Sequence, residues 1–198
     1  MLQLDRYAFD YAPFYCEENV WRLLRRRELA GRPAWALIVS SPSGRIVALR
    51  QKAGRNLDGL VHWDYHVLAL VEDEEEGFLA LDLDSDLPFP GPAAAHLQAS
   101  FPEDVQASMR PLFRLLPASF YTTELRSDRS HMRRADGSWI AQPPPWTPPG
   151  GGMVADRNLL RWIDVRSPSP GKVLARSRLL RFLEGRARPP VPGSPAVH

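Results

Sequence analysis

Four β-rich runs fill the middle of the chain, and they limit its fold more than any other feature. The runs "AWALIVS" and "RIVALRQ" are separated by the turn sequence "SPSG", which predicts a hairpin over residues 34–51. The runs "VHWDYHVLALV" and "GFLALDLD" flank an acidic turn at residues 72–76 and predict a second hairpin. Consecutive hairpins form an antiparallel meander. We therefore expect an α+β fold with helices packed on an antiparallel sheet.

Helical patterns surround these runs. Residues 16–30 predict a helix with an apolar stripe that ends before Gly31 and Pro33. Residues 91–120 predict helical or mixed structure, and within them the segment "PEDVQASMRPLFRLL" has apolar residues at near-helical spacing, although Pro111 must kink or restart the helix. A short helix is expected over residues 177–183. Residues 126–152 form a long Pro-, Gly- and Ser-rich loop, and loops of this length are usually functional or disordered.

Length and composition exclude several classes of protein. A chain of 198 residues suits one domain, which we place at residues 1–185, followed by a Pro-rich tail at residues 186–198 with the composition of disorder. One cysteine permits no internal disulfide, and no signal-peptide pattern opens the chain, so we expect a cytoplasmic protein. No apolar run is long enough to cross a membrane. The net charge of +2 gives no indication of a nucleic-acid partner.

The single cysteine, Cys16, stands where the first helix is expected to begin. A helix N-terminus stabilises negative charge, so this position favours the thiolate that acts as a nucleophile. Two considerations oppose this interpretation. A lone cysteine is more often a small buried apolar residue, and the carboxylates of Glu17 and Glu18 would disfavour ionisation of the thiol.

A histidine and two acids lie on the second predicted hairpin. If the loop consists of residues 73–75, Val71 lies opposite Gly77 and His66 lies opposite Asp82, close enough for imidazole to contact carboxylate. A register shifted by two would pair His66 with Asp84 instead. Acids in an apolar strand require partners if they are buried. The alternatives are a structural histidine in the core and acids at an exposed strand end.

A cysteine, a histidine and an acid in this order resemble the core of papain-like and transglutaminase-like hydrolases. The motifs "YCEENVW", "WDYHV", "DLDSDLPFP", "SDRSHM" and "GSW" also resemble a narrower group, the protein N-terminal glutamine amidohydrolase family. This resemblance covers residues 15–185. It implies that Cys16 is the nucleophile, His66 the general base and Asp82, rather than Asp84, the residue that orients the histidine.

The resemblance also implies a substrate and a setting. The substrate would be a peptide or protein with N-terminal glutamine, whose side chain is deamidated to glutamate through a thioester, as a step in protein degradation governed by terminal residues. The reaction requires no cofactor. The sequence contains no metal-ligand spacing either, so we expect no metal, and we expect a monomer.

Recognition of a free N-terminus calls for an acid near the pocket, because an ammonium group would pair with it. Glu17, Glu18 and Asp64 are the candidates, although each could be an ordinary surface or helix-end acid. Trp63 and Tyr65 could form the walls of the pocket, although strand aromatics are more often core residues.

The loop motif "SDRSHM" is a further candidate wall. We expect Asp128 and Ser130 to lie at the pocket, because loops on rigid frames often bind substrates. Arg129 is expected to brace the loop through an ion pair. His131 is a rival to His66 as the base, and we consider it the weaker candidate.

Two other functions fit the same residues. A related cysteine peptidase or acyltransferase would use the same three groups on a backbone amide or with an amine acceptor. A non-catalytic peptide-binding module would use the long loop and the tail, and it would keep working without Cys16.

Overall fold

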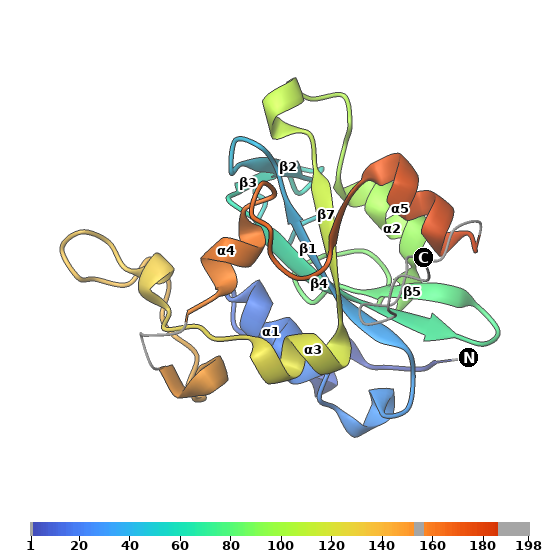
Figure 1. The fold of residues 1–198 in the computed structure, drawn as a ribbon, viewed down its shortest axis with the longest axis horizontal. Coiled ribbons are helices and arrows are strands. Elements are labelled where there is room, and N and C mark those ends of the chain that lie inside the picture. Colours follow the sequence, from blue (N-terminus) through green and yellow to red (C-terminus); the bar gives the residue numbers. More distant parts are fainter. Residues whose placement is uncertain (1, 153–156, 186–198) are drawn as a thin grey trace, which may run out of the picture.

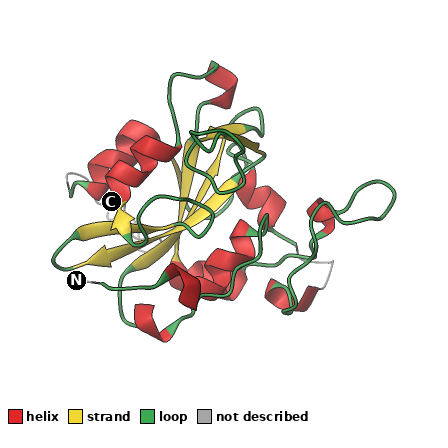
Figure 2. Cartoon of the chain, turned by 180° about the vertical axis from the view of Figure 1, so that it is seen from behind, coloured by secondary structure: helices red, strands yellow, loops and turns green. Residues whose placement is uncertain are grey.

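A six-stranded antiparallel sheet forms the centre of the protein in a computed structural model that describes residues 2–152 and 157–185. Its strands lie in the order β6-β5-β4-β1-β7-β8. The strands are β1 (Ala34–Ser40), β4 (His66–Asp73), β5 (Gly77–Leu81), β6 (Gly91–Pro92), β7 (Leu112–Pro117) and β8 (Lys172–Ala175). Strands β2 (Ile46–Ala48) and β3 (Val61–Trp63) form a separate two-stranded sheet. The expected α+β class is confirmed (Figures 1 and 2).

Helices cover both faces of the large sheet (Figure 1). Helices α1 (Cys16–Leu23), α3 (Ala118–Glu124) and α4 (Leu159–Ile163) pack on one face, and α2 (Ala93–Ser100) and α5 (Arg176–Leu183) pack on the other. Short 3₁₀ turns occur at residues 6–8, 27–29, 107–109, 130–132 and 149–152. Within the described residues, no helix is both long and apolar enough to cross a membrane.

Strand β4 shows why the sheet is buried on both sides. Val67, Ala69 and Val71 belong to the core that includes α1, whereas Leu68 and Leu70 belong to the core that includes α2. A strand with apolar partners on both faces has no polar alternation. His66 begins this strand, so its side chain is held at the edge of a packed core.

The second predicted hairpin is present, but its register differs from the expected one. Strands β4 and β5 pair with Asp73 opposite Gly77 and Val71 opposite Leu79. The loop therefore consists of residues 74–76, and the predicted pairing of Val71 with Gly77 is wrong. Continued from the last pair, Ala69 with Leu81, this register would place Asp84 opposite His66.

The first predicted hairpin is wrong. Strand β1 pairs with β4 on one side and with β7 on the other, so no edge of β1 remains for β2. Strand β2 pairs with β3 instead, from Ile46 opposite Trp63 to Ala48 opposite Val61. The meander of four strands is therefore replaced by a sheet in which β1 is central.

The prediction of helical or mixed structure over residues 91–120 is confirmed in its mixed form, but the helical interpretation of the spacing within residues 102–116 is wrong, because residues 112–117 form strand β7. Phe113 and Leu115 face the α2 core, while Leu116 faces the α1 core. Apolar residues on both faces of a central strand do not alternate with polar ones, and this made the spacing look helical. Arg114 is buried among them and donates to backbone carbonyls that include those of Trp162 (2.8 Å) and Asp164 (2.9 Å).

The first helix is shorter than predicted. It begins at Cys16, as expected, but ends at Leu23, and a separate 3₁₀ turn follows at residues 27–29. Arg26 between them has extended backbone angles (φ −73°, ψ 145°), which end the helical run. The C-terminal helix, expected over residues 177–183, is confirmed as α5. The tail at residues 186–198 lies outside the described residues, and the division of the chain at residue 185 stays a prediction.

Candidate active site

The N-terminus of α1 is fixed by the segment that precedes it. The side chain of Asn19 accepts from the backbone N–H of Ala12 (2.9 Å) and donates to its carbonyl (2.8 Å). Phe14 has a positive φ of 69°, a conformation that is uncommon for a residue with a side chain and that clusters at functional sites. These features hold the backbone of Cys16 in a defined place beside the sheet.

The thiol of Cys16 is buried, with 8% of the residue exposed, and forms no disulfide. Burial raises the pKa of this thiol well above its usual value, and the negative charges of Glu17 and Asp84 add to the rise. A hydrogen bond from the backbone of Val67 acts in the opposite direction. Together these effects raise the pKa of the thiol, whereas the helix N-terminus alone would lower it and favour the thiolate. The resting sulfur is therefore a neutral thiol that needs a base.

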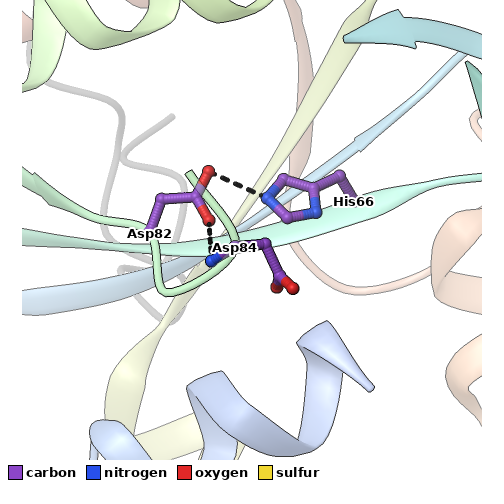
Figure 3. Close-up of side chains that lie close together, drawn as sticks. All are labelled: His66, Asp82 and Asp84. Carbon is purple, nitrogen blue, oxygen red and sulfur yellow. Dashed lines mark hydrogen bonds and ion pairs between the residues drawn. The ribbon is translucent and has the colours of Figure 1, made fainter. Parts of the chain in front are cut away.

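His66 and Asp82 form a buried hydrogen-bonded pair. Nε2 of His66 lies 3.0 Å from Oδ2 of Asp82, and both side chains are almost completely buried. Figure 3 shows the second ring nitrogen turned away from this contact. When Nε2–H donates to the carboxylate, Nδ1 carries the lone pair that can accept a proton. The predicted partner Asp82 is therefore present, although the register predicted for it is not.

Asp82 is held by more than His66. Its Oδ1 accepts the backbone N–H of Asp84 (3.0 Å), and its Oδ2 also lies 3.3 Å from Nε2 of His96 on α2. The sequence analysis missed His96. A detectable signal existed, since Ala93, His96, Leu97 and Ser100 form the buried stripe of that helix, and a histidine on such a stripe requires a polar partner.

The charges of the cluster shift the pKa values of its members. Burial opposes ionisation of Asp82, but the charge of His66 and hydrogen bonds from His66 and His96 outweigh it and lower the pKa of Asp82. Burial also opposes protonation of His66, yet Asp82 and the nearby carboxylates Asp84 and Glu17 raise the pKa of the imidazole above its usual value.

Asp84 behaves differently from Asp82. Burial and the charge of Asp82 raise the pKa of Asp84 to about 6, even though His66 and Tyr11 partly offset this. The hydroxyl of Tyr11 donates to Oδ1 of Asp84 at 2.7 Å. Figure 3 shows the Asp84 carboxylate on the opposite side of the chain turn from that of Asp82.

A cavity of about 260 Å³ brings several of these groups together. Cys16, His66 and Asp84 line it, and so do three of the predicted substrate-binding residues, Trp63, Asp64 and Tyr65. The remaining lining residues are Phe14, Gly44, His131, Met132, Ile140, Leu160 and Ile163. The cavity therefore joins the start of α1, the start of β4, the long loop and α4.

Glu17 lies behind the cavity wall rather than in the lining. Its Oε2 accepts from the hydroxyl of Tyr65 (2.9 Å), and its Oε1 lies 3.3 Å from Nε2 of His131. Tyr65 and His131 are also within hydrogen-bond distance of each other, at 3.2 Å. Glu17 thus positions two residues of the wall.

Glu18 binds side chains of the long loop. Arg129 donates to both of its oxygens, at 2.7 and 2.8 Å, and Trp146 Nε1 donates to one of them at 2.8 Å. Glu18 is fully buried and is not a lining residue of the cavity. The expectation that Arg129 braces its loop through an ion pair is confirmed.

Asp128 and Ser130 make hydrogen bonds that stabilise the loop. Asp128 Oδ1 accepts the backbone N–H of Ser130 (3.0 Å), and Arg157 donates to the hydroxyl of Ser130 (2.9 Å). Neither residue lines the cavity, whereas His131 beside them does. The loop motif therefore reaches the cavity through its last two residues, His131 and Met132.

One group of side chains has the proximity that a metal ion needs. Ligand atoms of His66, Asp82 and Asp84 lie within 4.8 Å of one another. Two of the three side chains already hydrogen-bond to each other, and Asp84 has Tyr11 as its donor. These contacts make the cluster a hydrogen-bonded group, and the sequence-based expectation of no metal stays a prediction.

Comparison with known proteins agrees with this arrangement of fold and cavity. The family model of N-terminal glutamine amidase matches residues 11–183. A protein N-terminal glutamine amidohydrolase of Drosophila ananassae is 42% identical over 171 residues, which covers 82% of this chain and 80% of the relative. The protein of the same name from Arabidopsis thaliana is 35% identical over 157 residues, covering 74% and 71%.

The matching family model and the named relatives show that the chain is an amide hydrolase. The chain belongs to the N-terminal glutamine amidohydrolase family.

Proposed function

We propose that this protein deamidates the side chain of N-terminal glutamine in peptides and proteins, leaving glutamate and releasing ammonia. The observation that carries the proposal is the cavity that Cys16 and His66 both line, with His66 hydrogen-bonded to the buried carboxylate of Asp82. The names of the relatives give the substrate.

The reaction begins with proton transfer. Since burial keeps the Cys16 thiol neutral, Nδ1 of His66 removes its proton as the sulfur attacks the side-chain amide carbon. The backbone N–H of Cys16 is one donor for the resulting oxyanion, because the first N–H groups of a helix have no intrahelical partner. Asp82 stabilises the imidazolium that forms.

Two steps complete the reaction after the tetrahedral intermediate has formed. The carbon–nitrogen bond breaks, and ammonia leaves with the proton that His66 returns to it. A thioester joins Cys16 to the glutamyl group. His66 next takes a proton from water, which attacks the thioester. The carbon–sulfur bond breaks as His66 returns the proton to the sulfur of Cys16, and the peptide bond of the substrate stays intact.

The surrounding residues shape the pocket. Trp63, Tyr65 and Asp64 contact the substrate as parts of the lining, while Glu17 acts on it through Tyr65 and His131. Glu18, Asp128 and Ser130 act indirectly, because they hold the loop in place.

The setting of the reaction is part of the proposal. We propose a cytoplasmic monomer that acts on N-terminal glutamine without a cofactor or a metal and without a nucleic-acid or membrane partner. Its product would enter degradation governed by the terminal residue.

A set of three peptides tests the reaction. The protein should release ammonia from a peptide that begins with glutamine and should give a product whose mass fits replacement of NH₂ by OH. The N-acetylated peptide and an Asn-initiated peptide should be poor substrates. Shortening of the peptide would indicate a peptidase, and transfer to an added amine would indicate an acyltransferase. Absence of ammonia from the first peptide would overturn the proposal.

The single cysteine allows a second test of the nucleophile. Cys16→Ala should abolish ammonia release while the circular dichroism spectrum and the melting temperature stay close to those of the parent. Alkylation by iodoacetamide should remove activity in proportion to the label, since one site is available per chain. A Cys16→Ala variant that retains activity would exclude the thioester route.

A further inference from the structure

The buried acids around the cavity differ in whether a basic side chain already pairs with them. Glu18 has Arg129, Glu17 has His131, and Asp82 has His66 and His96. Within residues 2–152 and 157–185, no ion pair within 4.0 Å is found for Asp84. Lys52 lies in its neighbourhood, but its ammonium donates to the carbonyl of Leu83 (2.8 Å).

Asp84 is buried and lines the cavity. The residue is 8% exposed and shares the cavity with Cys16 and His66. Its Oδ1 accepts from Tyr11, and among the described residues its Oδ2 has no hydrogen-bond donor. A buried carboxylate without a cation is unfavourable, and the free energy is recovered when a charged partner enters.

The proposed reaction supplies such a partner, since N-terminal glutamine carries an α-ammonium a few atoms from the amide carbon that Cys16 attacks. We infer that Asp84 binds the α-ammonium of the substrate and so makes the site selective for a free N-terminus. This inference rests on the proposed function and names the residue that recognises the substrate amine.

The other candidate acids fit this role less well. Glu18 has both oxygens engaged by Arg129, and Glu17 lies behind Tyr65. Asp64 lines the cavity but is exposed, and ion pairs in water contribute little to binding. Asp84 combines access to the cavity with burial, where a charge interaction is stronger.

The same charge helps the reaction to finish. Replacement of the amide by a carboxylate places a second negative charge in the cavity that Asp84 lines. Like charges at short range repel each other, so the product is bound less tightly than the substrate. Selection of the free amine and release of the acid then follow from one side chain.

Binding measured without turnover tests the inference. In the Cys16→Ala background at pH 7, we would compare by calorimetry a Gln-initiated peptide with the same peptide in which hydrogen replaces the α-amine. The free-amine peptide should bind about 10–100-fold more tightly, as expected for a buried hydrogen bond between charged groups. Adding Asp84→Asn should remove most of this difference while the affinity for the desamino peptide changes less than about twofold.

Asp64→Asn in the same background is the matched control, because this exposed acid lines the same cavity. It should preserve the preference for the free amine. The inference would be overturned if Asp84→Asn lowered the affinity for both peptides equally, or if the preference for the free amine survived in that variant. A parent that shows no preference would overturn it as well. Failure of the proposed function is a separate result, since it would appear as no ammonia release by the unmodified protein.

A measurement without the Asp84 substitution covers the case in which that variant does not fold. The pKa of Asp84 is raised to about 6, so the preference for the free amine should shrink between pH 7 and pH 5 as Asp84 becomes protonated. Tyr11, Asp82, His66 and Lys52 are the titratable groups that act on it. A preference that stays constant over this range would contradict the assignment.

Discussion

Two regions of the protein meet at the cavity, and they are built in different ways. The first, the frame, consists of the starts of α1 and β4 and the end of β5, and it carries Cys16, His66 and Asp82. The second, the loop at residues 126–152, contains only short 3₁₀ turns and extends from the body of the molecule at the left of Figure 1. The frame is held by packed apolar layers, whereas the loop is held mainly by polar contacts, among which those of Arg129 are central, and by a small apolar cluster that includes Tyr15 and Met132.

This difference suggests separate roles, with the chemical step in the frame and the entry of substrate controlled by the loop. Arg129 binds both oxygens of Glu18 and the carbonyls of Pro144 (3.2 Å) and Trp146 (2.7 Å). The loop supplies His131, Met132 and Ile140 to the cavity lining. Changes in the frame should therefore alter the rate of the chemical step, and changes in the loop anchor should alter stability and substrate binding.

Among substitutions that leave Cys16 in place, the largest effect is expected from Asp82→Asn in the frame. The variant loses the charge that orients and stabilises the imidazolium, so kcat should fall about 10²–10⁴-fold while KM changes little. Asp86→Asn is the matched control, because Asp86 is an exposed acid four residues further on that pairs with Arg50. A loss confined to KM would show that Asp82 shapes the pocket and does not act on His66.

The pH profile of the same variant gives a second measurement. The proposed mechanism requires neutral His66, so kcat/KM should rise with pH through the pKa of His66. In the parent this limb should lie above 6.5, because Asp82, Asp84 and Glu17 raise that pKa. Without the charge of Asp82, burial should move the limb to lower pH. An unchanged limb would mean that another group titrates.

A smaller loss of activity is expected from Arg129→Leu in the loop. Glu18 would remain buried without its cation, which costs about 3–5 kcal/mol in such pairs. Thermal and denaturant unfolding should report the destabilisation. Because the loop forms a wall, kcat/KM should fall about 10–100-fold, mainly through KM.

Two further variants test whether the effect of Arg129→Leu comes from its ion pair with Glu18. Arg133→Leu removes an exposed arginine of the same loop that stacks on Trp139 (3.9 Å), and it should leave stability and KM almost unchanged. The double variant Arg129→Leu/Glu18→Gln should recover part of the stability, because the unpaired charge is gone. If Arg129→Leu lowered kcat alone, the loop would act on the chemical step as the frame does, and the proposed distinction between the two regions would be wrong.

The sequence predicted local features of the frame well. The hairpin of β4 and β5 follows from an acidic turn between two apolar runs, and Cys16 at a helix start follows from a stripe of apolar residues. The hairpin geometry allowed either Asp82 or Asp84 as the partner of His66, and the family resemblance favoured Asp82, although the predicted register was off by two residues. Such a slip is possible because a shift by two keeps every side chain on the same face.

Long-range choices were not predictable from local pattern. Nothing in "AWALIVS" shows that β1 will pair with β4 and β7 and leave β2 to another partner. Strand β7 was mistaken for a helix because a central strand is apolar on both faces. Asp128 and Ser130 were placed at the pocket although they support the loop, and His96 was missed because its partner Asp82 is 14 residues away in the chain.

The smallest effect, and the finest test of the frame, concerns His96. We expect His96→Leu to lower kcat only about threefold to tenfold, because Asp82 loses one of its hydrogen-bond donors and keeps His66. Asp82 would then interact more strongly with His66, so the acid limb of kcat/KM should move to higher pH, opposite to the shift for Asp82→Asn. His96→Gln, which can still donate, should restore most of the activity and the original limb. His62→Leu is the control, because His62 is an exposed histidine on β3. Loss of activity in His96→Leu without any movement of the limb would show that His96 only fills space beneath the sheet, and that positioning of His66 depends on Asp82 alone.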